Sequence, residues 1–474
     1  EGINVVFASP FFLYIFMPLC IILYFCFKSL RAKNAVLLVF SLLFYAWGEP
    51  WFVLVMAATA FLDWCHGKII GAYRGTQLAK LSLIISIVTD IGILMVFKYS
   101  GFLVSNLNAI LPFAIPVPHL RLPIGISFYT FQTLTYVIDV YRGKVNPQKS
   151  YLRYLLYLCS YFQLVAGPIV RYEDVDGYLE NRESTLEGAA HGFVRFATGL
   201  AKKVIIADIA LEFVTKYMDG DLTAVPTLGA WFGMLMFTLE IYFDFSGYSD
   251  MAIGLAEIFG FKFPENFDHP YISKSVSEFW RRWHISLGSF FRDYVYIPLG
   301  GNRAHLYRNL FIVWFLTGFW HGASWNFILW GLYNGAFIML EKRFPEFFKR
   351  IPAVISHIYL LLVVNFGFML FHFTDLSRVG AFLGVLFGFG GREFVTTELR
   401  LDVMNNILWF VVTLLLCMPV KRLVSNFAKN LEVSSIGGAR AAGIARIIYT
   451  MGILFVSTAF LVGNSLHAFL YFQF

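Results

Sequence analysis

Two histidines in aromatic surroundings are the residues of this sequence best suited to chemistry. His284 ends the sequence WRRWH, and His321, 37 residues later, lies in the sequence GFWHG within a strongly apolar segment. An ionisable side chain in a membrane span is costly and marks a functional site by default. Burial disfavours the imidazolium form, and a neutral imidazole can accept a proton from a hydroxyl group. His321 is therefore a candidate general base, and His284 is a second candidate.

A structural role for His321 stays open at this stage. A histidine between the small residues Gly318 and Gly322 can hydrogen-bond across a helix pair, and local physics gives this interpretation equal weight. The same two glycines, four residues apart, leave one helix face without side chains,. We expect another chain segment or a substrate to approach that face.

The polar sequence YFDFSGYSD at 242–250 lies within a longer apolar segment of the chain. Its carboxylates cannot face lipid and need donors, for which Arg281, Arg282 and Arg292 are available. A structural ion-pair network explains this pattern as well as direct catalysis does. The residues to which we assign a structural or supporting role are Asp244, Ser246, Tyr248 and Asp250.

The sequence Gly300-Gly301-Asn302-Arg303 predicts a turn. Backbone N–H groups in such a turn, next to arginine, could bind phosphate. The sequence lacks the motifs of other common catalytic sites. No HExxH motif or carboxylate cluster gives the two histidines a third metal ligand, so we predict no metal site. The sequence also has no GxSxG elbow and no P-loop.

The composition identifies an integral membrane protein. Of 474 residues, 58% are apolar, 19% aromatic and 14% charged, and the mean hydropathy is +0.66. Soluble domains carry about 25% charged residues. The net charge of +7 includes no basic run of the length found in nucleic-acid arms,. We assign this excess to cytoplasmic loops and predict no nucleic-acid partner.

The apolar segments predict an all-α, polytopic fold with roughly 9–13 transmembrane helices. Expected spans include 122–141, 151–170, 228–260 and 307–339. Lys28, Arg31 and Lys33 after the first span, and the basic residues between 142 and 153, indicate cytoplasmic loops,.

We predict one membrane-embedded domain over 1–474, with its core at 7–345 and further transmembrane helices at 346–474. The polar, aromatic segment 262–306 interrupts the core. It is either a large aqueous loop or a re-entrant element, and its tryptophans and tyrosines favour the second interpretation.

Five ordered blocks resemble the membrane-bound O-acyltransferase family, in particular its bacterial branch, which includes the membrane subunit of alginate O-acetylation. The resemblance runs from about residue 7 to about residue 345, whereas the remainder matches only in hydrophobicity. The blocks are LPIGISFY at 122–129, AGP at 166–168, YFDFSGYSDMAIG at 242–254, residues 266–302, and WHG at 320–322.

The resemblance implies helices around a central tunnel in a bacterial inner membrane. It implies transfer of an acyl group, expected to be acetyl, from cytosolic acetyl-CoA to an extracytoplasmic polysaccharide. No tightly bound cofactor is expected. The family's membrane histidine corresponds to His321 and its upstream polar partner to His284. In one departure from the branch, Gln163 replaces a histidine.

We assign binding of the acyl-CoA donor to basic and polar residues near the two histidines: Arg281, Arg282, Asn302, Arg303 and Trp320. The expected partners are membrane lipids and an extracytoplasmic acetyltransferase of the SGNH-hydrolase type. Two alternatives stay open. One is a transporter or flippase that moves a lipid-linked sugar without acyl chemistry. The other is an acyltransferase that acts on lipid or protein.

Overall fold

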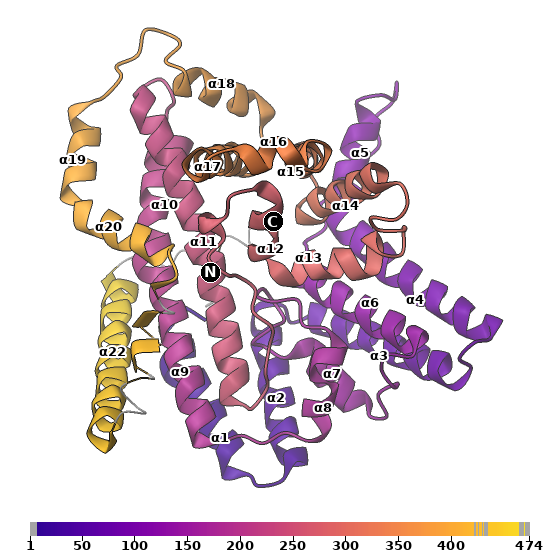
Figure 1. The fold of residues 1–474 in the computed structure, drawn as a ribbon. Helices are drawn as coiled ribbons and strands as arrows, with labels where there is room; N and C mark the ends of the chain where they lie inside the picture. The colour runs from indigo at the N-terminus through magenta and orange to yellow at the C-terminus, as the bar shows by residue number, and fades with distance from the viewer. Residues whose placement is uncertain are drawn as a thin grey trace. The chain divides into compact units, whose positions relative to one another are not determined.

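The computed structural model describes residues 7–420, 423–424, 426–428, 430, 435–463 and 469. These residues form α-helices and short 3₁₀ or π-helical turns, labelled η, and none of them lies in a strand (Figure 1). The end of the predicted C-terminal block, 464–474 apart from 469, lies outside the described residues. The chain divides into two compact units, and each is described by itself. A single domain stays a prediction.

Six helical stretches in the described part of the chain are long and apolar enough to cross a bilayer. A seventh is obtained when the bent pair of helices at 397–416 counts as one span. Shorter apolar helices lie at Phe12–Cys26 and Leu376–Leu386. The predicted all-α, polytopic membrane architecture is thereby confirmed. The central tunnel stays a prediction.

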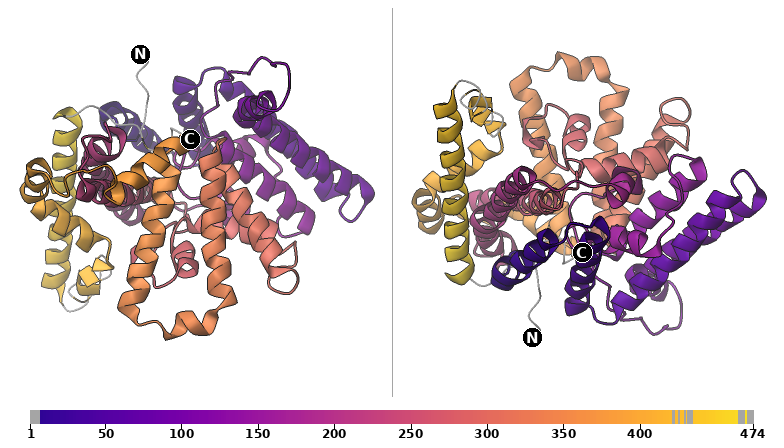
Figure 2. Two further views of the ribbon diagram at one scale, coloured as in Figure 1. Left: turned by 90° about the horizontal axis from the view of Figure 1, so that it is seen from above. Right: turned by 90° about the horizontal axis from the view of Figure 1, so that it is seen from below.

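The first unit contains residues 7–196 and 248–265. Helices α3 and α4 run side by side, and α6 packs on both (Figure 2). Its elements are η1 Phe12–Phe16, α1 Met17–Cys26, α2 Leu30–Gly48, α3 Phe52–Ala72, α4 Gln77–Leu94, η2 Met95–Tyr99, α5 Ser100–Asn108, α6 Ile126–Arg142, α7 Tyr151–Cys159 and α8 Tyr172–Glu180.

Buried polar contacts join these helices. The Ser86 hydroxyl donates to Asp63 at 2.7 Å, and the Thr133 hydroxyl donates to Asp90 at 2.9 Å. Both carboxyl groups are buried in spans. A polar group without a partner there would cost several kcal/mol, so such contacts determine which helix faces meet.

The second unit contains residues 197–247 and 266–463. Two long helices are shared by the units: α9 Leu186–Ala201 and α11 Thr227–Ile258. The other elements are η3 Lys202–Ala207, α10 Asp208–Val214, η4 Thr215–Asp219, η5 Pro270–Ile272, α12 Val276–Arg282, α13 Ile285–Phe291, η6 Arg292–Tyr296, α14 Leu306–His321, α15 Trp325–Arg343, α16 Pro345–Arg350, α17 Ala353–His372, α18 Leu376–Leu386, α19 Thr397–Asn405, α20 Ile407–Leu416 and α22 Ile436–Gly463.

The predicted single span at 307–339 is wrong, because the chain breaks after His321. Helices α14 and α15 form an antiparallel hairpin, and α17 packs on α15 (Figure 1). A Cβ on Gly318 would collide with the Phe327 carbonyl oxygen, and a Cβ on Gly331 would collide with the Trp314 carbonyl oxygen. The side-chain-free face of α14 is therefore occupied by the protein's own α15, which leaves no room there for a substrate.

From residue 266 on, the polar segment 262–306 contains short helices that belong to this unit. Ser275 caps α12 by accepting from the Glu278 N–H at 3.0 Å,. The carboxylate of Glu341 in α15 accepts from the N–H groups of Val276, at 2.6 Å, and Ser277, at 2.9 Å. Phe279, Trp283 and His284 are buried. A fully solvent-exposed loop is thus excluded for 276–291, and re-entrant placement in the bilayer stays a prediction.

Candidate active site

A cavity of 420 Å³ lies within the second unit, between the short helices and α14. Its size is in the range of small-molecule and cofactor sites, roughly 300–1,000 Å³. His284 is part of its wall. The other lining residues are Trp280, Arg281, Trp283, Leu287, Gly288, Phe291, Arg292, Tyr296, Asn302, Leu310, Val313, Trp314, Thr317 and Lys342.

Three cationic side chains line this cavity. Arg281 and Lys342 are exposed, and neither makes a side-chain hydrogen bond or ion pair within the described part of the chain. Arg292 is also exposed and pairs with the adjacent Asp293 at 2.7 Å. Positive charge at the wall of a cavity attracts an anionic ligand, and guanidinium groups suit phosphate oxygens.

The His284 ring is held by a hydrogen-bond network around Asn266. The Asn266 side-chain oxygen faces the Ser286 backbone N–H at 3.3 Å, the Ser286 hydroxyl at 2.8 Å and His284 Nδ1 at 3.1 Å. A backbone N–H can only donate, so the shared atom is an acceptor. Nδ1 therefore carries the ring proton, and Nε2 keeps its lone pair.

Burial keeps this ring uncharged. His284 is 2% exposed, and burial lowers its pKa to about 3. The backbone is left-handed there, with φ 45° and ψ 53°, a conformation that costs a non-glycine residue roughly 1–2 kcal/mol,. The Asn266 contacts hold the residue in this conformation. His284 is thus a preorganised, neutral hydrogen-bond acceptor.

His321 is the last residue of α14 and is half-buried. His321 is not part of the cavity wall, but it lies one helical turn beyond Thr317, which is,. Its ring makes edge contacts with the rings of Trp320, Trp330 and Phe371, with centroids 5.0, 4.8 and 5.3 Å away. His321 therefore lies at a helix end and not in the middle of a span.

Trp320 contacts both histidines, with its centroid 6.3 Å from that of His284. The structure therefore places the two predicted histidines around one indole. The buried Trp330 N–H, next to His321, has no acceptor within the described part of the chain. Such a donor beside a base could stabilise negative charge on a carbonyl oxygen.

The predicted turn at 300–303 is present, but the prediction that its glycine N–H groups bind phosphate is wrong. Gly300 and Gly301 have φ of 108° and 56°, as a glycine turn requires,. Their N–H groups, however, donate within the turn, to Ile297 O at 3.0 Å and Tyr296 O at 2.9 Å. These two groups are therefore not available to a phosphate.

The polar residues that follow the turn differ in position. Asn302 lines the cavity and accepts from the Tyr296 hydroxyl at 2.6 Å. Arg303 is exposed and is not part of the wall. Arg282 also lies outside the wall and pairs with Asp268 and Glu278 at 3.1 and 3.0 Å.

The carboxylates of the polar sequence 242–250 form ion pairs. In the second unit, Asp244 pairs with Lys203 at 2.7 Å, Lys203 also contacts Asp208 at 2.9 Å, and Ser246 is buried. The structure thus gives Asp244 a lysine partner in place of the arginines considered from the sequence.

In the first unit, Asp250 and Glu265 both pair with Arg195, at 2.9 and 2.6 Å. The buried Tyr248 stacks on Phe7 with ring centroids 4.9 Å apart. The partner of Asp250 is again a residue that the sequence analysis did not propose.

Four residues of the site were not predicted from the sequence: Trp330, Lys342, Asn266 as a partner of His284, and Arg292 as part of the cavity wall. Asn266 stands 18 residues before His284, and a lone asparagine in a loop gives no signal of its contacts. Lys342 lies in the last turn of α15, far along the chain from the two histidines. Within the described part of the chain, no group of three or more His, Cys, Asp or Glu could hold a metal ion.

Comparison with known proteins gives consistent matches. Residues 144–382 match the model of MBOAT, the membrane-bound O-acyltransferase family. The probable alginate O-acetylase AlgI of Azotobacter vinelandii is 42% identical over 398 residues, 81% of this chain and 78% of that protein. The peptidoglycan O-acetyltransferase of Helicobacter pylori is 30% identical over 99% of this chain and 97% of that protein. The teichoic acid D-alanyltransferase of Bacillus subtilis is 29% identical over 54% of this chain and 68% of that protein.

Proposed function

The chain belongs to the membrane-bound O-acyltransferase family and is an O-acyltransferase, and from this premise we propose that it transfers an acetyl group from acetyl-CoA to a hydroxyl group of an extracytoplasmic polysaccharide. The names of the relatives, which concern alginate, peptidoglycan and teichoic acid, support a glycan acceptor. They favour it over a lipid or protein acceptor and over a transporter without acyl chemistry.

The cavity that His284 lines carries the proposal. Its cations Arg281, Arg292 and Lys342 suit the phosphates of a coenzyme A donor,. The side of α14 that faces the cavity leads along the helix to His321. A thioester bound with its phosphates at the cations would thus extend toward both histidines.

In the proposed reaction, His321 accepts the proton of the acceptor hydroxyl as its oxygen attacks the thioester carbonyl. The C–S bond breaks, the ester forms, and the proton passes to the coenzyme A sulfur. His284 orients the thioester, and the Trp330 N–H donates to the carbonyl oxygen as negative charge develops. Positioning and oxyanion stabilisation suffice, because a thioester is already activated.

Two further parts of the proposal concern the cell. We assign the protein to a bacterial inner membrane, where cytosolic acetyl-CoA and an external acceptor are on opposite sides. An extracytoplasmic partner of the SGNH-hydrolase type would complete delivery to the polymer. Purified chain that acetylates the polymer fully by itself would rule out a need for that partner.

The test follows labelled acetyl from acetyl-CoA with the purified chain in proteoliposomes. His321→Ala should lower turnover by a factor of about 10²–10⁴, the usual contribution of a general base, with coenzyme A binding nearly unchanged. Trp330→Phe should lower turnover by about 10² with little change in KM. The matched control is His357→Ala, since this half-buried histidine near the start of α17 lies neither at the end of α14 nor in the cavity wall. Near-normal turnover of His321→Ala would overturn the assignment.

A further inference from the structure

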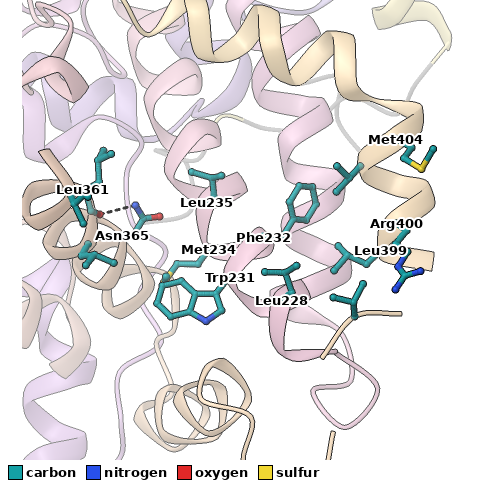
Figure 3. Close-up of a pocket in the computed structure, with 14 residues that line it drawn as sticks. Leu228, Trp231, Phe232, Met234, Leu235, Leu361, Asn365, Leu399, Arg400 and Met404 are labelled. Atoms are coloured by element: carbon teal, nitrogen blue, oxygen red, sulfur yellow. Dashed lines mark hydrogen bonds between the residues drawn. The ribbon is translucent and has the colours of Figure 1, made fainter. Parts of the chain in front are cut away.

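An apolar groove of 650 Å³ in the second unit shares no lining residue with the cavity of the candidate active site. Three helices form it: α11, α17 and α19 (Figure 3). The lining residues are Leu228, Trp231, Phe232, Met234, Leu235, Ile358, Leu361, Leu362, Asn365, Val395, Leu399, Arg400, Val403 and Met404. Only Asn365 and Arg400 are polar.

Hydrogen bonds to residues outside the groove hold its walls in place. Thr238 of α11 donates to the Asn365 side-chain oxygen of α17 at 2.9 Å. The Trp231 indole donates to the Leu386 carbonyl oxygen at 2.9 Å. Asp402 of α19 accepts from Lys216 and from the Tyr217 hydroxyl, both at 2.6 Å. The groove is therefore a built feature, because each of its three helices is fixed by a polar contact.

The polar groups of the groove differ in what they can offer a ligand. The Asn365 amide donates to the Leu361 carbonyl oxygen at 2.7 Å and accepts from Thr238, so both of its polar atoms are engaged. Arg400 is exposed, and its guanidinium makes no hydrogen bond or ion pair among the residues that the structure describes. The groove therefore suits a long apolar chain with one anionic group at its edge, where Figure 3 shows Arg400.

The position of Arg400 indicates the source of such a ligand. Helix α11 is a candidate span that begins at Thr227, and the N–H groups of Thr227 and Leu228 donate to the backbone at 393 and 394. Arg400 follows 394 by six residues and so lies near the end of the span, at the level of lipid head groups. Leu235, Leu361 and Leu362 are 39%, 39% and 43% exposed, so the groove opens sideways toward lipid chains.

We propose that this groove binds one acyl chain of an anionic phospholipid, with the phosphate on Arg400. The apolar walls exclude water around the chain, and the cation selects for negative charge. Neither contact involves the acyl-transfer site, so the proposal stands apart from the proposed function.

Native mass spectrometry of the purified full chain tests this. Phosphatidylglycerol and phosphatidylcholine with identical chains are offered in turn, and the affinity for the first bound lipid is measured. We expect a preference of roughly fivefold for phosphatidylglycerol, because both lipids carry a phosphate but the choline ammonium of phosphatidylcholine offsets its attraction to Arg400. Arg400→Gln should abolish the preference. Leu361→Trp, which fills the groove from a partly exposed position, should reduce binding of both lipids.

Matched controls are Arg350→Gln and Val354→Trp, both exposed in the second unit and outside the groove. They should leave the preference and the binding unchanged. Inorganic phosphate alone should not compete, since it has no chain. Equal affinity for the two lipids, a preference that survives Arg400→Gln, or tight binding to a folded Leu361→Trp variant would each overturn the proposal. Thermal melting without added lipid reports whether each variant is folded.

Discussion

At the scale of single residues, the two histidines of the site have different environments. His284 is fully enclosed, has one defined tautomer and lies in left-handed backbone. His321 is half-buried at a helix end among aromatic rings. A rigid neutral acceptor suits substrate orientation, whereas a base must reach an incoming hydroxyl group. This difference supports the roles that we propose for them.

The Asn266 contact to His284 predicts a pH effect. The pKa of His284 is about 3, so the wild-type ring stays neutral from pH 5 to 9. Asn266→Asp would place a carboxylate next to Nδ1 of His284. This negative charge stabilises the imidazolium and should raise the pKa of His284 by roughly one to three units. If the neutral ring is required, activity is lost as the pH falls through the raised pKa. The acid limb of kcat/KM against pH should therefore move to higher pH.

Asn266→Ala serves as the comparison for this effect. It removes the acceptor of Nδ1 without adding charge, so it should lower kcat through misplacement of the ring and leave the acid limb where it is in the wild type. Identical pH profiles for the two variants would show that Asn266 does not act through the protonation of His284.

At the scale of elements, the α14–α15 hairpin positions His321. Gly318 lies one turn before His321 and has no space for a Cβ against α15. Gly318→Ala should therefore separate the helices and destabilise the protein by about 1–3 kcal/mol, the usual cost of overpacking. Because His321 moves with the end of α14, acyl transfer should fall more steeply than the population of folded protein. Thermal melting and turnover on the same preparation measure the two effects.

Gly380 in α18 supplies the control. A Cβ at this position would meet nothing within 4 Å. Alanine is a better helix former than glycine, so Gly380→Ala should leave the melting temperature unchanged or raise it slightly. If both alanine variants behaved alike, close packing at Gly318 would not be what fixes His321.

Element boundaries show where sequence patterns stop being informative. The run 307–339 is apolar throughout, so hydropathy alone predicts one span, whereas the turn at 322–324 depends on Gly318 and Gly331 meeting across the hairpin. The 300–301 turn was predicted correctly from its glycines. The internal use of their N–H groups depends on the preceding η6 turn, which the sequence did not indicate.

At the scale of the whole molecule, composition was enough to predict an all-α membrane protein. A chain with little charge and long apolar runs has few other stable folds, because backbone polar groups in a bilayer must be paired internally. The ordered motifs were enough to select His284 and His321 as candidates, and their roles stay predictions. Long-range polar pairs were not predictable. Lys203 pairs with Asp244 across 41 positions and Arg195 with Asp250 across 55 positions, and several arginines were equally plausible donors from the sequence alone.

Contacts within the first unit define two opposite faces. Arg121 contacts Glu49 at 3.0 Å, and the Tyr45 hydroxyl donates to Ile124 O at 3.0 Å, so the end of α2 lies near the start of α6. Arg74 donates to Val145 O at 3.4 Å, so the end of α3 lies near the end of α6. Segments 27–33, 73–76 and 142–150 therefore share one face, and 49–51 and 109–125 share the other.

The charge difference between these faces predicts the orientation of the unit. The first face carries seven basic residues (three in 27–33, one in 73–76 and three in 142–150), and the second carries Arg121. By the positive-inside rule the first face is cytoplasmic. Single cysteines at exposed positions test this, in a chain whose accessible Cys26 and Cys65 are replaced by serine. A membrane-impermeant maleimide should label Ala114→Cys in intact cells but label Tyr73→Cys only after permeabilisation. The reverse pattern would place the basic loops outside and would contradict the orientation that the positive-inside rule assigns to this unit.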